Sequence, residues 1–209
     1  MIKLTDSVWK FSGESNVYLI ELGENKEKIL IDTGDRKDRD LLIKSLKENG
    51  ILPEDINIVI MTHLHYDHLG NIDLLKNAKI YASSKEIKCL KENPIGTILN
   101  KELTEKITTR IKNKELTIED ADLLNQTKNE TDDTVETTPS LKIINTPGHT
   151  KGSICIYLEK EKILFSGDTL FNGCHGRTDL PTSIAKEMEK SLKRLLKYDY
   201  TILCPGHDY

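Results

Sequence analysis

The chain has 209 residues, four cysteines and a formal net charge of -4, with lysine and glutamate interspersed. This length suits one domain with a sizeable core, and the charge pattern lacks the clustered basic face that nucleic-acid binding requires. The cysteines form no C-x-x-C pair, which argues against a structural zinc site or a disulfide framework. Because neither an apolar signal segment nor a run of about 18 apolar residues is visible, we expect a reduced, cytoplasmic protein without membrane contact.

Strand patterns and one helix pattern fill the first part of the chain. Short apolar runs bounded by glycine turns predict three strands, at 8–11, 16–22 and 28–31. Leucine and isoleucine recur at helical spacing over 38–49, and Gly50 follows as a helix C-cap. The β-branched run at 56–61 predicts a buried strand that leads into a histidine-rich segment.

The remaining chain continues this alternation around one segment of different composition. We predict helices at 71–76, at 83–92 with Ser84 as N-cap, and at 183–196. We predict strands at 79–82, 141–145, 153–158, 162–165 and 200–204. Within 93–140, residues 125–138 are poor in apolar residues, so we predict an exposed loop or lid there. Because candidate metal ligands lie on both sides of it, we predict a single domain over residues 1–209.

Five of the six histidines belong to short motifs that also contain aspartate. The motifs are THLHYDH at 62–68, TPGH at 146–149, SGDT at 166–169 and PGH at 205–207. Imidazole and carboxylate groups suit zinc, and also iron or manganese. Residues two apart in an extended segment point the same way, so His63 and His65 can reach one metal.

Each motif follows a predicted strand, and side chains at strand ends converge in layered α/β proteins. Asp67 and His68 could therefore reach a second metal beside the first. The two carboxylate oxygens of Asp168 could bridge the two ions. Metals bridged in this way lie ~3.5–4 Å apart and can share a hydroxide whose parent water has a pKa lowered to about 7.

In these motifs the sequence resembles the metallo-β-lactamase superfamily, and within it the glyoxalase II-like hydrolases. The similarity extends from NVYLI at 16–20 through DTG at 32–34 to GHDY at 206–209. It implies an α/β fold, a four-layer αββα sandwich with two divalent metals at one edge of its sheets. The resemblance assigns ligands as follows: His63, His65 and His149 to the first metal, Asp67, His68 and His207 to the second, and Asp168 to both. It assigns Asp32 to support of the metal loops, where a purely turn-forming aspartate is the alternative.

A second pattern is shared with fewer subfamilies. GDTLF at 167–171 followed by GRTDL at 176–180 resembles small glyoxalase II-like hydrolases and persulfide dioxygenases. We expect Arg177 to bind a substrate carboxylate or to pair with Asp179. His175 is either a substrate contact or an exposed loop residue.

The sequence differs from three groups of the superfamily in ways that narrow the expected function. The given sequence ends two residues after His207, where glyoxalase II continues into a helical domain that binds glutathione, so we expect a broader thioesterase rather than a dedicated glutathione thioesterase. Thr169-Leu170-Phe171 stands where acyl-homoserine lactonases carry a tyrosine. His65 stands where flavodiiron proteins carry glutamate.

We therefore predict a metallo-hydrolase that cleaves a small-molecule acyl thioester or activated ester. The expected nucleophile is a hydroxide bridging two zinc ions, with Asp67 as the catalytic residue that ligates and orients it; iron is the alternative metal. The rival function is a mononuclear iron persulfide dioxygenase that uses His63, His149 and Asp168. Specificity is expected to come from 93–140 or from a partner subunit, and the oligomeric state stays open.

Overall fold

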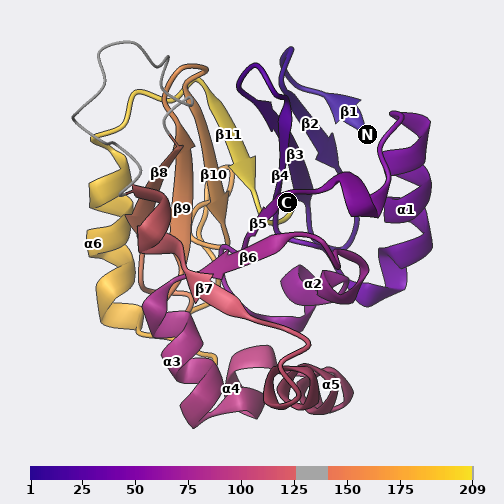
Figure 1. The fold of residues 1–209 in the computed structure, drawn as a ribbon. Helices are drawn as coiled ribbons and strands as arrows, with labels where there is room; N and C mark the ends of the chain where they lie inside the picture. The colour runs from indigo at the N-terminus through magenta and orange to yellow at the C-terminus, as the bar shows by residue number, and fades with distance from the viewer. Residues whose placement is uncertain (126–140, 209) are drawn as a thin grey trace, which may run out of the picture.

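Two β-sheets packed face to face form the centre of the protein (Figure 1). The structure is a computed structural model that describes residues 1–125 and 141–208. In the larger sheet the strands follow one another in chain order, antiparallel from β1 to β4 and parallel from β4 to β7. These strands are β1 (Ile2–Lys3), β2 (Val8–Phe11), β3 (Val17–Leu22), β4 (Glu27–Ile31), β5 (Ile58–Ile60), β6 (Lys79–Ala82) and β7 (Ile118–Asp120).

The smaller sheet has the strand order β11-β10-β9-β8. Strands β8, β9 and β10 pair antiparallel, and β11 adds to β10 in parallel. Their bounds are β8 (Leu141–Asn145), β9 (Ile154–Leu158), β10 (Ile163–Gly167) and β11 (Ile202–Pro205). Strands β9 and β10 are buried along their whole length, since one face meets the larger sheet and the other meets a helix.

Helices cover both outer faces of the sheet pair. The helices are α1 (Arg39–Glu48), α2 (Tyr66–Leu69), α3 (Ser84–Glu92), α4 (Pro94–Ile98), α5 (Lys101–Lys112) and α6 (Ala185–Leu195). Figure 1 shows α1 on the outer side of the larger sheet and α6 on the outer side of the smaller sheet. No helix in the described ranges has the length and apolar character needed to cross a bilayer.

Three apolar clusters correspond to the three interfaces between the four layers. Ile20 and Ile31 of the larger sheet pack against Ile156 and Phe165 of the smaller sheet. Leu42 of α1 belongs to the cluster between the larger sheet and its helices. The third cluster joins α6 to the smaller sheet through Leu195, Cys155 and Tyr157. The predicted αββα sandwich is therefore confirmed.

Most predicted elements lie within two residues of their observed bounds. The helix predicted at 71–76 was wrong, because only Ile72–Leu74 forms a short 3-10 helix there. The side-chain amide of Asn71 donates to the carbonyls of Thr33 and Asp35, which ties the start of this segment to the loop after β4. The predicted N-cap Ser84 was also wrong, since the hydroxyl of Ser83 accepts from the backbone N–H of Glu86.

The segment at 93–125, for which we predicted no helix or strand, is structured. It contains α4, α5 and β7, followed by a 3-10 helix at Ala121–Asn125. Asn93 and Asn100 cap the two helices by accepting from the backbone N–H groups of Gly96 and Leu103. Most of the predicted lid at 125–138 lies outside the described residues.

Candidate metal centre

Four strand ends bring the candidate ligands together where the two sheets meet. The segment with His63, His65, Asp67 and His68 follows β5 of the larger sheet. The other three candidates follow strands of the smaller sheet: His149 after β8, Asp168 after β10 and His207 after β11. Segments far apart in the chain thus supply side chains to one place, as the strand-end argument predicts.

The candidate ligand atoms form three overlapping groups. His63, His65 and His149 form one group, and Asp67, His68 and His207 form another. A third group joins His63 and His68 to Asp168. Within each group the ligand atoms lie within 4.8 Å of one another. Apart from the shared Asp168, the first two groups have the same residues as the two metal sites that the resemblance implies.

Asp168 lies within reach of both of these groups. Its Oδ1 is 3.3 Å from Nε2 of His68. Its Oδ2 is 3.4 Å from Nε2 of His149 and 3.5 Å from Nε2 of His207. Asp67 and His207 are the partly exposed candidate ligands and define the open side of the centre; Oδ2 of Asp67 is 3.3 Å from Nε2 of His207. One carboxylate therefore faces side chains of both groups, which is the geometry required of a bridging ligand.

Hydrogen bonds fix the orientation of four of the imidazole rings. Nδ1 of His149 lies 2.8 Å from the carbonyl oxygen of Arg177, and Nδ1 of His207 lies 2.6 Å from the carbonyl oxygen of Glu14. A carbonyl only accepts, so Nδ1 carries the hydrogen and Nε2 is left for the cluster. Nδ1 of His63 contacts the hydroxyl of Thr62 at 3.1 Å. The fourth ring, that of His68, is held by a carboxylate.

That carboxylate belongs to Asp32, which is buried at the turn after β4. Its Oδ2 lies 2.8 Å from Nδ1 of His68. Asp32 also accepts from the backbone N–H and the hydroxyl of Thr62, both at 2.7 Å. Its φ of +60° is left-handed, a conformation that aspartate and asparagine tolerate better than most residues. Asp32 thus holds one candidate ligand directly and the backbone beside another, which goes beyond a turn-forming role.

The two groups differ in their electrostatics. Burial lowers the pKa of His63 well below its usual value, and burial together with His149 lowers the pKa of His65 to about 3. Burial opposes protonation of His207 too, but hydrogen bonds to Asp168 and Asp67 raise its pKa to about 10. Histidines of the first group are therefore neutral near pH 7 and offer a lone pair to a cation.

Burial and neighbouring charges also act in opposite directions on the pKa of Asp168. Burial alone would raise its pKa, but His68 and His207 hold it well below the usual range. For His68, the opposing effect of burial is outweighed by Asp168 and Asp32, so its pKa is raised. The centre therefore keeps its carboxylates ionised in a nearly solvent-free place, which favours a bound cation.

The residues present fit divalent metal ions. Several buried atoms make no hydrogen bond among the described residues, and they include Nε2 of His63, His65 and His68 and Oδ1 of Asp168. The last two atoms lie 3.3 Å apart as an ion-pair contact, and the other two contact no such group within the parts of the chain that the structure describes. Unpaired buried polar atoms are rare in folded proteins, since each one costs desolvation free energy. These atoms come from three candidate ligands of one cluster and the candidate bridge. Metal coordination accounts for all four.

Comparison with known proteins agrees with this centre. The family model described as the metallo-beta-lactamase superfamily matches residues 12–207. This chain belongs to the metallo-beta-lactamase superfamily. A probable metallo-hydrolase of Methanocaldococcus jannaschii is 32% identical over 200 residues, which are 92% of this chain and 87% of the relative. The cytoplasmic hydroxyacylglutathione hydrolase of Saccharomyces cerevisiae is 27% identical over 216 residues, 96% of this chain and 66% of that protein.

Two solved structures share the fold of this chain. The BLEG-1 B3 metallo-beta-lactamase aligns with a TM-score of 0.68 and 27% identity, covering 97% of this chain and 92% of that one. The structure of TTHA1623 in a di-iron-bound form aligns with a TM-score of 0.64 and 25% identity, covering 96% and 91%. Membership of a metal-binding superfamily and the histidine cluster together support a divalent-metal site.

Two glycines lie so close to candidate ligands that a side chain at either position would overlap with them. A Cβ atom on Gly206 would lie 2.2 Å from Oδ1 of Asp168 and 2.8 Å from Cε1 of His68. A Cβ atom on Gly176 would lie 2.1 Å from the carbonyl oxygen of Asp168. The glycine that precedes His207 is therefore required by close approach to candidate ligands rather than by its backbone conformation.

The loop after Asp168 places Arg177 at the surface beside the centre. Its guanidinium pairs with Asp179 through two contacts of 3.0 Å, which is one of the two roles expected for it. Both side chains are about 70% exposed, so the pair is open to exchange with a ligand. Nδ1 of His175 contacts the carbonyl oxygen of Gly176 at 2.8 Å. The side chain of His175 is exposed.

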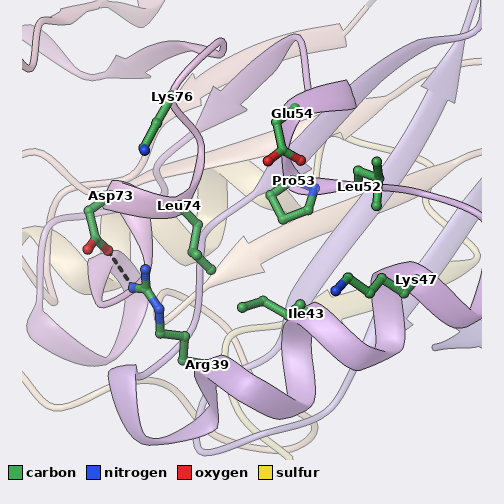
Figure 2. Close-up of a pocket in the computed structure, with 9 residues that line it drawn as sticks. All are labelled: Arg39, Ile43, Lys47, Leu52, Pro53, Glu54, Asp73, Leu74 and Lys76. Carbon is green, nitrogen blue, oxygen red and sulfur yellow. Dashed lines mark hydrogen bonds and ion pairs between the residues drawn. The ribbon is translucent and has the colours of Figure 1, made fainter.

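Two cavities lie outside the cluster. One cavity, of about 460 Å³, lies beside α1, and none of the candidate ligands lines it. Figure 2 shows its lining residues, with the guanidinium of Arg39 hydrogen-bonded to Asp73. The other, of about 210 Å³, is lined by Tyr66 of α2 and by Asn100, Leu103 and Lys106 at α5. The second cavity therefore lies between the 93–125 segment and Tyr66, the residue before the candidate ligand Asp67.

Glu86 is the residue at this centre that sequence reasoning did not identify. It is fully buried on α3 and accepts from the backbone N–H of Leu64, between His63 and His65. A signal was present: Glu86 shares a helical face with Cys89 and Leu90, which are also buried. A glutamate on the apolar face of an amphipathic helix requires internal partners.

Proposed function

We propose that this protein is a binuclear metallo-hydrolase that cleaves a thioester or a similarly activated ester. One observation carries the proposal: Asp168 faces two separate three-ligand groups. Two-metal sites of this kind suit hydrolytic chemistry. Superfamily membership, with relatives named metallo-hydrolase and hydroxyacylglutathione hydrolase, supports the reaction class.

In this proposal His63, His65 and His149 hold the first metal, and Asp67, His68 and His207 hold the second. Asp168 would contribute a carboxylate oxygen to each site. When bound, the two ions polarise a carbonyl group and lower the pKa of water so that it can attack at neutral pH. Asp32 and the carbonyls of Arg177 and Glu14 keep the imidazole rings oriented toward the ions.

Asp67 is the proposed catalytic residue on the open side of the centre. Its side chain is 15% exposed, whereas those of His63 and His68 are closed to solvent. A carboxylate there can accept a hydrogen bond from the attacking water and fix its orientation while also binding the second ion. A thiol leaving group has a pKa of about 8.5, so a thioester requires no separate general acid.

The substrate class follows from the surroundings of the open side. The exposed guanidinium of Arg177 is proposed to bind a carboxylate of the substrate in exchange for Asp179, because exposed ion pairs are weak. The cavity between Tyr66 and α5 is proposed to accept a further part of the substrate. The exposed Arg177 therefore favours an acidic thioester.

Zinc is the proposed metal, with iron as the alternative. Histidine and carboxylate ligands suit either ion. The similar structure of TTHA1623 was solved in a di-iron-bound form, which keeps iron open for this chain.

The deciding experiment combines metal analysis with substrate screening. The protein would be purified without added metal, its metal content measured, and its activity tested on glutathione thioesters, other thioesters, lactones and glutathione persulfide. We expect two zinc ions per chain and thioester hydrolysis. One iron per chain with oxygen uptake on the persulfide would overturn the proposal in favour of a dioxygenase.

A further inference from the structure

Glu86 connects two loops that carry candidate ligands of the first metal. Its Oε2 accepts from the backbone N–H of Leu64 at 3.0 Å. Its Oε1 accepts from the hydroxyl of Thr150 at 2.6 Å and from the backbone N–H of Gly152 at 3.1 Å. Leu64 lies between two candidate ligands and Thr150 directly follows another. A single carboxylate therefore sets the spacing between these loops.

The first residues of α3 pack closely against the loop that follows His149 and contains Gly152. The hydroxyl of Ser83 donates to the carbonyl of Gly152 at 2.5 Å and accepts from the N–H of Glu86. A Cβ atom on Gly152 would lie 2.4 Å from the backbone nitrogen of Glu86. The loop is therefore held against the helix from both its N–H and its carbonyl side.

Burial of this carboxylate is costly for folding alone. Glu86 is 0% exposed, and within residues 1–125 and 141–208 it makes no ion pair with a lysine or arginine. Burial raises its pKa, while hydrogen bonds from Thr150, Leu64 and Gly152 act in the opposite direction. An apolar side chain of similar shape would avoid the desolvation cost of a buried charge. A role in placing the ligand loops explains the presence of the carboxylate.

We infer that Glu86 is a positioning residue that sets the first metal site by fixing the loop of His63 and His65 relative to the loop of His149. This inference rests on the proposed function only in that these histidines bind a metal. It does not depend on which substrate is cleaved. Partners that hold ligand loops without touching the ion commonly change metal affinity by about 10–100-fold.

The substitution Glu86→Gln tests this with little change in shape. An amide has one acceptor oxygen, so in either orientation its NH2 group faces the N–H of Leu64 or of Gly152. One of the two backbone hydrogen bonds must then be lost, and the loops lose their fixed spacing. Thr150→Val removes the hydroxyl contact at nearly constant volume, whereas Thr150→Ser keeps it.

The readout is zinc affinity at each site, measured by competition with a chromophoric chelator. His149→Ala and His207→Ala identify which dissociation constant belongs to which site. For Glu86→Gln we expect first-site affinity to fall about 10–100-fold, with the second site changed much less. We expect kcat to fall more than KM rises. Thr150→Val should act in the same direction, and Thr150→Ser should resemble the wild type.

The matched control is Glu92→Gln on the same helix, where Glu92 is exposed and pairs only loosely with Lys88 at 3.8 Å. It should leave both zinc affinities unchanged. Unchanged first-site affinity in Glu86→Gln, or an equal fall at both sites, would overturn the inference. If Glu86→Gln fails to fold, equal affinities in Thr150→Val and the wild type would overturn it. Two zinc ions bound without thioester cleavage would contradict the proposed function and leave this inference standing.

Discussion

Oδ2 of Asp32 lies 2.8 Å from Nδ1 of His68, and both side chains are buried. The same carboxylate holds the backbone and hydroxyl of Thr62, the residue before His63. One aspartate at the end of a strand of the larger sheet therefore holds candidate ligands of both ligand groups, His68 directly and His63 through Thr62. This relationship also explains why a residue with φ of +60° stands at the end of β4.

Asp32→Asn should lower zinc affinity at the second site by about 10–100-fold and reduce kcat. The amide offers one acceptor oxygen where the carboxylate serves three donors, so in either orientation its NH2 group faces Nδ1 of His68 or the N–H of Thr62, and the ligand segment loses one of its anchors. Asparagine tolerates the left-handed backbone, so the change adds little strain. Chelator competition measures the affinity, and exposed Asp6→Asn is the control. Wild-type affinity in Asp32→Asn would contradict this role.

Gly206→Ala should disrupt the centre through a steric clash. The new Cβ would lie 2.2 Å from Oδ1 of Asp168, so we expect a loss of about 1–3 kcal/mol in the free energy of unfolding, together with weaker metal binding. Gly50→Ala is the control, because Gly50 has a φ of +73° but open space around it. It should lose stability and keep its metal affinity. Equal metal affinity in both variants would show that Gly206 has no special role.

The sequence predicted the centre better than it predicted the helices around 93–125. The motif at 62–68 predicted a metal site because its histidines and aspartate are suitable ligands and because it directly follows a predicted strand. The anchors of His149 and His207 could not be found, since they are backbone carbonyls of Arg177 and Glu14 and have no signature in side-chain chemistry. They depend on loop packing that only the folded chain defines.

The missed helices have a similar physical cause. In α5 the buried positions are Leu103, Thr104 and Ile107, a narrow stripe in a segment rich in Lys, Glu and Thr. Such a pattern is close to that of an exposed loop. The capping residues Asn93 and Asn100 were the usable signal, because each stands directly before its helix.

Arg177→Met should raise KM for a thioester that carries a carboxylate and leave KM unchanged for a neutral one. The guanidinium is exposed, so the melting temperature should not change measurably. Steady-state kinetics on a matched pair of substrates would test this. Equal KM values for wild type and variant on both substrates would assign Arg177 only to its pair with Asp179.

The four thiols should differ sharply in reactivity. Burial raises the pKa of Cys155 to about 11 and that of Cys204 to about 12, and burial also raises the pKa of Cys89. Cys174 alone among the four is exposed. Because the thiolate is the reactive form, Ellman's reagent at pH 8 should label one thiol rapidly in the native protein and four after denaturation. Cys174→Ser should remove the rapid phase; a second rapid thiol in the native protein would contradict the burial pattern.

The central claim is that two metal ions bridged by Asp168 support hydrolysis. Its most direct test is a zinc titration of the metal-free protein while thioester hydrolysis is followed. We expect the rate to saturate at two zinc ions per chain and to stay near the background in Asp168→Ala. Saturation at one ion, or full activity in Asp168→Ala, would contradict the binuclear account.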